Sequence, residues 1–155
     1  MADSDSIYRP FIDAGFKQHR FTVKSHAGAG VGINTFVYTP ASGQERPQHT
    51  LVLLHGHPQS LVIWHRVGPQ LVQKLNNTRI VVPDLRGHGQ SDAVKVARND
   101  RGEYQDERAR ATYSKREMAS DVVEVLDQID PDLKSSKFSL VGHDRGAVSV
   151  APAVW

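Results

Sequence analysis

An aspartate between two glycines, in Gly142-His-Asp144-Arg-Gly146, directly follows the apolar run Phe138–Val141 near the C-terminus. When such a segment joins a strand to a helix, its central residue lies in a strained turn that exposes the side chain. Small flanking residues then let strand and helix approach closely. The pattern predicts a nucleophile elbow in which Asp144 takes the place usually held by serine. A five-residue pattern is weak by itself, and the alternative is a turn aspartate that bonds its own backbone.

The segment His55-Gly-His57-Pro58 ends an earlier apolar run, Thr50–Leu54. In α/β-hydrolases the loop at this place supplies one backbone N–H of the oxyanion hole, and the residue after the nucleophile supplies the other. The predicted donors are therefore the backbone amides of His57 and Arg145. A metal site is the competing interpretation, because His-x-His brings two imidazoles near each other. The three residues that follow Pro58 add no further ligand, so we expect no metal.

The composition excludes several classes of function. The chain has 155 residues, of which 39% are apolar and 23% charged, enough for one globular domain with a core. It has no cysteine, which excludes thiolate metal sites, disulfides and cysteine nucleophiles. The net charge is only +2 with both signs interspersed, so we expect no nucleic-acid partner and no membrane partner. The N-terminus is polar, without a signal peptide, and no apolar run is long enough to span a membrane, so we expect a cytoplasmic protein.

Apolar runs alternate with amphipathic segments, which predicts the elements that position these motifs. The predicted strands are Phe21–Val23 and Ile33–Tyr38 around a glycine-rich turn, and three strands buried on both faces at Thr50–Leu54, Arg79–Val82 and Phe138–Val141. This alternation is typical of an α/β fold, a mostly parallel sheet with helices on both faces. In such sheets the chemistry gathers at the C-terminal ends of the strands, where the glycine-rich and histidine-rich segments above lie.

Two helices are predicted between these strands. One begins near Pro69, and the other follows Ser114-Lys-Arg-Glu117, which has the pattern of a capping box. The charged segment Ala93–Thr112 between them is predicted to be a solvated loop, and Asp84–Gly89 a structural turn that packs beneath the site.

Four motifs in order carry a resemblance to a known family. They are His55-Gly-His-Pro-Gln-Ser60 with Trp64-His65, Asp84-Leu-Arg-Gly-His-Gly-Gln-Ser91, Tyr113-Ser-Lys-Arg-Glu-Met-Ala-Ser-Asp121 and Val141-Gly-His-Asp-Arg-Gly146. On these motifs the chain resembles α/β-hydrolases of the epoxide hydrolase and haloacid dehalogenase branch, fluoroacetate dehalogenase-like proteins most of all. The resemblance implies that an ionised Asp144 attacks an electrophilic carbon and forms an ester. A water activated by a histidine then hydrolyses the ester while the two amides hold the oxyanion, and no cofactor takes part.

The resemblance also implies which residues bind the substrate. Arg145 would grip a substrate carboxylate, which favours a small haloacid, although an arginine paired with a local acid is the alternative. The second carboxylate-binding arginine of the family is replaced here by Val148, so an epoxide substrate stays open. Trp64 is assigned to core packing by default, and a place in the substrate-binding pocket is its functional alternative.

Residues 148–155 depart from the family pattern, because Pro152 stands where a helix should be in mid-course. We therefore expect a partial α/β-hydrolase core at residues 1–147 and a divergent tail at 148–155 that arises from a misread splice site, a frameshift or a truncated gene. The cap domain, second acid and late histidine of the family are not placed. We expect the ester to form without turnover, and a fragment with no catalysis of its own is the non-enzymatic alternative. For the full-length protein we expect a small-molecule substrate and allow for a homodimer.

Overall fold

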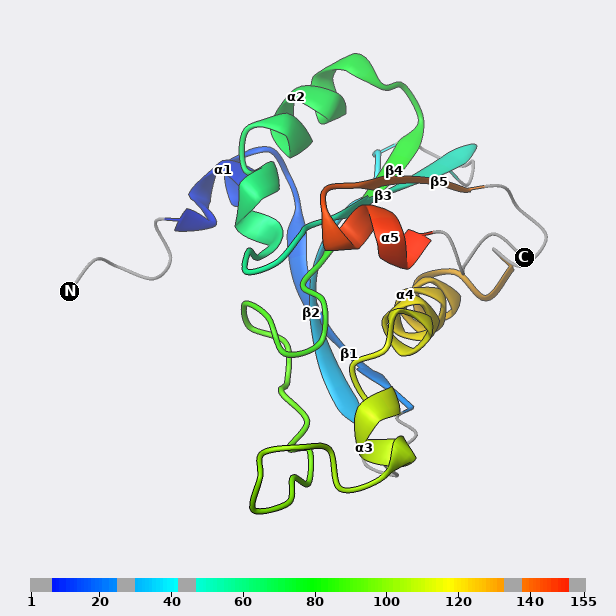
Figure 1. Cartoon of the computed structure of the whole chain (residues 1–155). Coiled ribbons are helices and arrows are strands. Elements are labelled where there is room, and N and C mark those ends of the chain that lie inside the picture. The colour runs from blue at the N-terminus through cyan, green and yellow to red at the C-terminus, as the bar shows by residue number, and fades with distance from the viewer. Residues whose placement is uncertain (1–6, 25–29, 42–46, 133–137, 151–155) are drawn as a thin grey trace.

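The computed structural model describes residues 7–24, 30–41, 47–132 and 138–150 (Figure 1). In chain order its elements are α1 (Arg9–Asp13), β1 (Lys17–Val23), β2 (Val31–Tyr38), β3 (His49–Leu54), the 3-10 helix η2 (Leu61–Trp64), α2 (Val67–Lys74), β4 (Thr78–Pro83), α3 (Glu107–Ala111), α4 (Lys115–Ile129), β5 (Phe138–Gly142) and α5 (Arg145–Val150).

The five strands form one sheet in the order β1-β2-β4-β3-β5. β1 and β2 pair antiparallel, as the predicted hairpin requires, and β2 pairs antiparallel with β4. β3 lies between β4 and β5 and runs parallel to both. Four strands therefore point in one direction and only β2 opposes them, so the predicted mostly parallel sheet is confirmed. The carboxyl ends of β3, β4 and β5 lie at the same edge of the sheet, and the three predicted motifs follow them.

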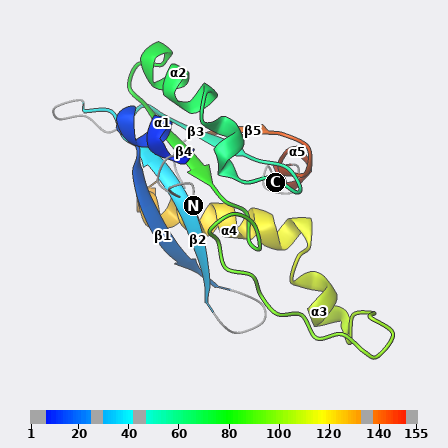
Figure 2. The ribbon, with the colours of Figure 1, turned by 90° about the vertical axis from the view of Figure 1, so that its left-hand side faces the viewer.

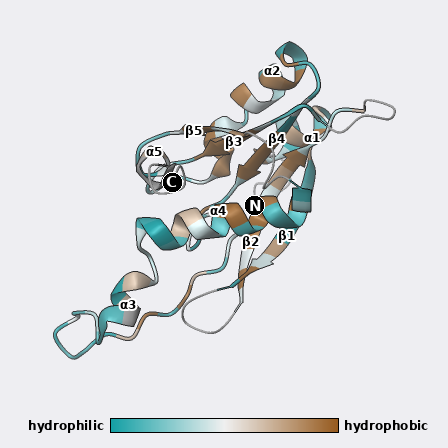
Figure 3. Cartoon of the chain, turned by 90° about the vertical axis from the view of Figure 1, so that its right-hand side faces the viewer, coloured by the Kyte–Doolittle hydropathy of each residue, from teal (hydrophilic) through white to brown (hydrophobic). Residues whose placement is uncertain are grey.

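Helices cover both faces of the sheet, as predicted (Figure 2). On one face α4 buries an apolar stripe of Met118, Val122, Val125 and Leu126 against strand residues such as Val52 and Val81. On the other face α1 and α2 pack over a second cluster that contains Phe11, Phe36, Leu53 and Ile80. In Figure 3 β3 and β4 are mostly apolar, while α4 carries both polar and apolar residues. Two separate apolar clusters thus hold the central strands rigidly.

The start of α4 follows the predicted cap. Ser114 takes an extended conformation and its Oγ accepts the N–H of Glu117 at 3.2 Å. The Ser114 amide donates to the carbonyl of Ala111 at 2.8 Å. The Glu117 carboxylate contacts the guanidinium of Arg86, at 3.4 Å. Glu117 thus joins the start of α4 to the turn after β4.

The turn after β4 is tied to α4 through the buried side chain of Arg86. Its Nε donates to Asp121 Oδ2 at 2.6 Å, a second nitrogen contacts the other carboxylate oxygen, and Nη1 donates to the carbonyl of Thr112 at 2.9 Å. Burial alone would lower the pKa of Arg86, but the hydrogen bonds and charges of Asp121 and Glu117 outweigh it and raise the pKa above its ordinary value. The predicted structural turn at Asp84–Gly89 is thus anchored by a charged side chain with no exposed surface.

Two expectations are corrected. β5 is not buried on both faces, because it lies at the edge of the sheet and Val141 is 42% exposed. The segment Ala93–Thr112 is not wholly loop, since it contains α3 and an antiparallel bridge between Arg98 and Tyr104. Residues 148–150, which the sequence analysis placed in the divergent tail, are the last turn of α5. Pro152 lies outside the described residues, so the proposed boundary at residue 147 stays a prediction.

Candidate active site

Asp144 lies in a tight turn between β5 and α5 and has a left-handed backbone, with φ of +50°. Two glycines make this turn feasible. A Cβ at Gly142 would lie 2.4 Å from the backbone N of Ala147, and one at Gly146 would lie 2.5 Å from the carbonyl oxygen of Leu54. Both clashes are with backbone, which cannot move aside. The strand-turn-helix context expected of a nucleophile elbow is therefore present, and the Asp144 carboxylate is exposed at its tip.

The loop after β3 packs against this turn. The N–H of His143 donates to the carbonyl of Leu54 at 3.0 Å, which extends the pairing of β3 with β5. A Cβ at Gly56 would lie 2.7 Å from the Cβ of Asp144, so only glycine lets the two loops meet. The N–H of His57 then donates to Asp144 Oδ2 at 2.9 Å. The structure thus brings together His57 and Asp144, two residues 87 positions apart that the sequence predicted to meet.

The pKa of the Asp144 carboxyl group lies below its ordinary value. The hydrogen bond from the His57 amide lowers it most, followed by the hydrogen bond from the Arg145 amide. A small desolvation effect opposes them, and the charges of His143 and Arg145 add to the lowering. Both predicted backbone donors therefore point at the carboxylate and stabilise its charged form.

A layer of buried polar groups supports the loop from below. His55 is fully buried, and its Nε2 accepts the N–H of Leu85 at 2.9 Å, so its Nδ1 carries the proton and donates to the carbonyl of Gly56 at 2.7 Å. Burial lowers the pKa of His55, against smaller opposing effects of the Gly56 carbonyl and Asp84. The 3.8 Å approach of His55 Nε2 to Asp84 Oδ1 is therefore not an ion pair, because that nitrogen has no proton.

Asp84 organises three backbone segments around the same layer. One carboxylate oxygen accepts the N–H of Leu61 at 2.7 Å. The other accepts the side-chain amide of Asn34 at 2.8 Å and the N–H of Gln90 at 3.0 Å. Since its carboxylate is fully buried and engaged with these donors, Asp84 supports the site rather than reacting in it.

Two contacts at the site were not foreseen from the sequence. Gln59 Oε1 lies 3.3 Å from the N–H of Gly56 and 3.0 Å from Nδ1 of His143, so it joins the loop to the elbow. His57 Nδ1 lies 3.0 Å from Nε2 of His88, which belongs to the segment predicted to be purely structural. One sequence feature could have identified His88 as a site residue. It follows a predicted strand, and the ends of the parallel strands lie at the same edge of the sheet.

The side chains of His57, His88 and Arg145 line one small cavity of about 30 Å³ next to the elbow. Trp64 is not among the residues that line it. The structure places Trp64 at the end of η2, half-buried against the apolar cluster under α1 and α2. Its indole Nε1 is buried without a hydrogen-bond partner among the described residues. A role of Trp64 in substrate binding stays a prediction, and packing is what the described contacts show.

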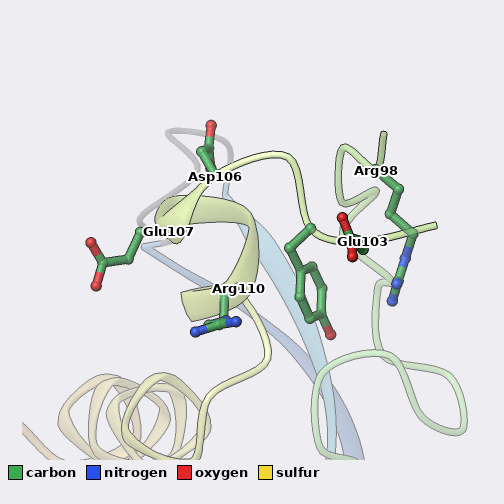
Figure 4. Close-up of a pocket in the computed structure, with 6 residues that line it drawn as sticks. Arg98, Glu103, Asp106, Glu107 and Arg110 are labelled. Atoms are coloured by element: carbon green, nitrogen blue, oxygen red, sulfur yellow. The ribbon is translucent and has the colours of Figure 1, made fainter. Parts of the chain in front are cut away.

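A larger cavity of about 570 Å³ lies elsewhere, between α3 and the preceding loop (Figure 4). Its walls are the side chains of Arg98, Glu103, Tyr104, Asp106, Glu107 and Arg110. Most of these are exposed charged groups on the outside of the molecule, and Arg98 lies over the Tyr104 ring at 4.5 Å. None of these side chains lies in a strained turn or accepts hydrogen bonds from two backbone amides as Asp144 does. The candidate active site is therefore the one at Asp144.

The described residues show neither a group of metal ligands nor a helix that could span a membrane. Within residues 7–24, 30–41, 47–132 and 138–150, no three or more His, Asp or Glu side chains are grouped to hold a metal ion. Among the helices described, none has the length and apolar character needed to cross a membrane.

Comparison with known proteins gives consistent matches. The family model described as alpha/beta hydrolase fold matches residues 49–151. A fluoroacetate dehalogenase from Burkholderia sp is 42% identical over 96 residues, which cover 62% of this chain and 26% of that protein. A soluble epoxide hydrolase from Corynebacterium sp. (strain C12) is 35% identical over 98 residues, which cover 63% and 27%.

Superposition on solved structures agrees with these sequence matches. The crystal structure of a Nostoc sp PCC 7120 protein, provisionally described as an α/β-hydrolase, superposes with a TM-score of 0.65 at 31% identity. That match covers 92% of this chain and 38% of the other. The chain spans about a quarter of the length of the curated relatives it matches.

Proposed function

Because the chain belongs to the α/β-hydrolase fold family, we propose that it carries the nucleophile of a hydrolase, Asp144, which forms an ester with a small-molecule substrate. One observation carries this proposal. An exposed carboxylate stands at a left-handed turn, with φ of +50°, and its Oδ2 accepts the His57 N–H at 2.9 Å. Aspartate suits this role because it is ionised at neutral pH and needs no base for its attack.

In the first step a lone pair of Asp144 Oδ1 attacks the carbon that bears the halogen, from the side opposite the halogen. A C–O bond forms, the carbon–halogen bond breaks, and its electron pair leaves with the halide. Oδ2 is the oxygen that the His57 amide holds, so it becomes the carbonyl oxygen of the ester. The negative charge of the carboxylate passes to the halide.

In the second step a water attacks the ester carbonyl at Asp144 Cγ after a base takes one of its protons. The charge that develops on Oδ2 faces the amide of His57, and the Arg145 amide also hydrogen-bonds this carboxyl group; both lower its pKa in the free protein. Such preorganised donors act as an oxyanion hole and stabilise the tetrahedral intermediate. Cleavage of its bond to the substrate oxygen, with return of the proton, releases a hydroxy acid and restores Asp144. The base and its acidic partner are not assigned to residues of this chain.

The substrate class that we propose is a small haloacid. Arg145 follows the nucleophile directly and lines the cavity beside it, where its guanidinium can bind a carboxylate. The relative named fluoroacetate dehalogenase supports this choice at 42% identity. Epoxide hydrolysis is the second candidate, supported by the relative named soluble epoxide hydrolase at 35% identity and by Val148 in place of a second arginine.

The full-length protein tests both candidates in one assay series. Incubation with fluoroacetate should release fluoride, and incubation with an aryl epoxide should give little diol. A single turnover in ¹⁸O-labelled water should place the isotope in the Asp144 carboxyl group, because water attacks Cγ. Release of diol without fluoride would favour the epoxide hydrolase. No turnover of either substrate, with Asp144 unlabelled, would favour the non-catalytic alternative.

A further inference from the structure

Three side chains that can carry positive charge surround the small cavity beside Asp144. His57 comes from the loop after β3, His88 from the turn after β4, and Arg145 from the start of α5. The cavity of about 30 Å³ has room for one small group, such as a water or a single carboxylate oxygen. Leu85 and Met118 close its apolar side. The loops around Asp144 thus place one guanidinium and two imidazoles next to its carboxylate.

The hydrogen bonds fix which nitrogen of each imidazole carries a proton. Nδ1 of His88 lies 3.0 Å from the carbonyl oxygen of Arg86, which only accepts, so this nitrogen donates. In the neutral ring Nε2 of His88 is then an acceptor, and Nδ1 of His57 donates to it at 3.0 Å. His57 can therefore gain a proton at its other nitrogen, Nε2, without breaking its bond to His88. His88 has no such freedom while both bonds persist.

We propose that protonated His57 binds the carboxylate of the substrate together with Arg145, and that His88 is the positioning residue that orients the His57 ring. This assignment rests on the proposed function and adds a specificity-determining residue to it. The carbon attacked in a 2-haloacid is bonded directly to the carboxylate carbon. The substrate carboxylate must therefore come close to the charged Asp144, and the repulsion between the two anions has to be offset locally.

Groups from several elements surround the His57 side chain. The Asp144 carboxylate accepts the backbone N–H of His57, and Nε2 of His88 accepts its Nδ1–H. Arg145 on α5 lines the same cavity, and His143 stands beside Asp144 on the elbow. Tyr113, from the loop before α4, lines the cavity, and its hydroxyl is engaged with the backbone of Val94. In the proposed complex a proton on His57 Nε2 is donated to the substrate carboxylate.

Two reagents that differ only in charge separate binding from chemistry. Chloroacetate carries the carboxylate that the proposal requires, and chloroacetamide is a neutral molecule of similar size. The purified chain is incubated with each over a range of concentrations, and the rate at which the ester forms on Asp144 is followed by mass spectrometry. The readouts are the half-saturating concentration and the maximum rate for each reagent.

His57→Gln should raise the half-saturating concentration of chloroacetate by roughly 10- to 100-fold, the effect of losing one charge-assisted hydrogen bond. The comparison is the ratio of the half-saturating concentrations of chloroacetate and chloroacetamide in the same variant, because a general change at the elbow affects both reagents alike. In the wild type this ratio should rise as a rising pH removes the proton from His57 Nε2, and in His57→Gln it should not. His19→Gln on β1, at the far edge of the sheet, is the matched control and should behave as the wild type.

His88→Phe should lose part of the chloroacetate affinity, and His88→Gln should restore some of it because its amide oxygen can accept from His57 Nδ1. Equal saturation by chloroacetate in wild type and His57→Gln, with Asp144 still labelled, would overturn the carboxylate site and leave the nucleophile standing. Labelling of Asp144 by neither reagent would overturn the proposed function, and this inference with it.

Discussion

At the residue scale, the reactivity proposed for Asp144 depends on how the turn holds its carboxylate. Oδ2 is bound by the His57 amide, and in the proposed mechanism Oδ1 is the oxygen that attacks. The backbone amides of His57 and Arg145 also keep the carboxyl group ionised. The donors that would stabilise the oxyanion in the proposed mechanism therefore also stabilise the charged form of Asp144 in the free protein.

The lowered pKa of Asp144 predicts how ester formation depends on pH. A carboxyl group with a depressed pKa keeps its charge as the pH falls past the ordinary value of about 3.9 and loses it only below that. The rate of labelling by neutral chloroacetamide should stay level from neutral pH down to about pH 4 and decline at lower pH. Rates from quenched samples, with circular dichroism to check folding at each pH, provide the measurement. A decline that begins near pH 6 would contradict the assigned environment.

The glycine at position 146 predicts a second effect. Gly146→Ala puts a Cβ at 2.5 Å from the carbonyl oxygen of Leu54, so α5 and the end of β3 must separate. We expect a loss of about 1–3 kcal/mol in the free energy of unfolding and a large loss of Asp144 labelling. Gly102→Ala is the control, because Gly102 also has positive φ but no neighbour within 4 Å. It should cost about 1 kcal/mol and leave labelling unchanged. Equal labelling in both variants would show that the turn does not depend on this contact.

At the element scale, the sequence predicted the strands and the helix start that depend on local patterns. It did not predict the exposure and the side-chain contacts that depend on residues far away along the chain. The apolar runs located β3 and β4, and Ser114 located the start of α4, because periodicity and capping are local. Exposure of β5 depends on its place at the edge of the sheet, which a run of apolar residues does not encode. Asp144, His57 and Arg145 were found because each follows a strand end. The partner of His57 was missed because His88 is 31 residues away along the chain.

The buried contact between Arg86 and α4 predicts a large effect on stability. Arg86→Ala leaves the carboxylates of Asp121 and Glu117 buried without their cation, which should cost about 3–5 kcal/mol. Arg9→Ala removes a solvent-exposed pair with Asp13, whose side chains are 73% and 63% exposed, and should cost at most about 0.5 kcal/mol. Urea denaturation of the two variants gives the comparison. Similar losses for both would mean that Arg86 does not anchor the turn after β4.

At the scale of the whole molecule, one edge of the sheet is open in the part of the chain that the structure describes. β5 pairs only with β3 there, and its Val141 is 42% exposed. An exposed apolar edge strand is a template for association with another chain. The matched segment covers about a quarter of the length of the curated relatives.

The open edge predicts self-association of the 155-residue chain. Val141→Lys should reduce it, because a charged side chain on an edge strand disfavours pairing with another edge. Val123→Lys adds the same charge on the outer side of α4, where Val123 is 38% exposed, and should have little effect. Light scattering over a series of concentrations measures both. An equal reduction by the two variants would point to net charge rather than to the β5 edge.

The most direct test of Asp144 as the nucleophile is to find which residue becomes esterified. The purified chain is incubated with chloroacetate, its intact mass is measured, and the labelled peptide is sequenced by mass spectrometry. We expect one carboxymethyl group on Asp144, and none in Asp144→Asn with the same circular dichroism spectrum. A folded chain that stays unlabelled, or one labelled equally in wild type and Asp144→Asn, would contradict the assignment of Asp144 as the nucleophile.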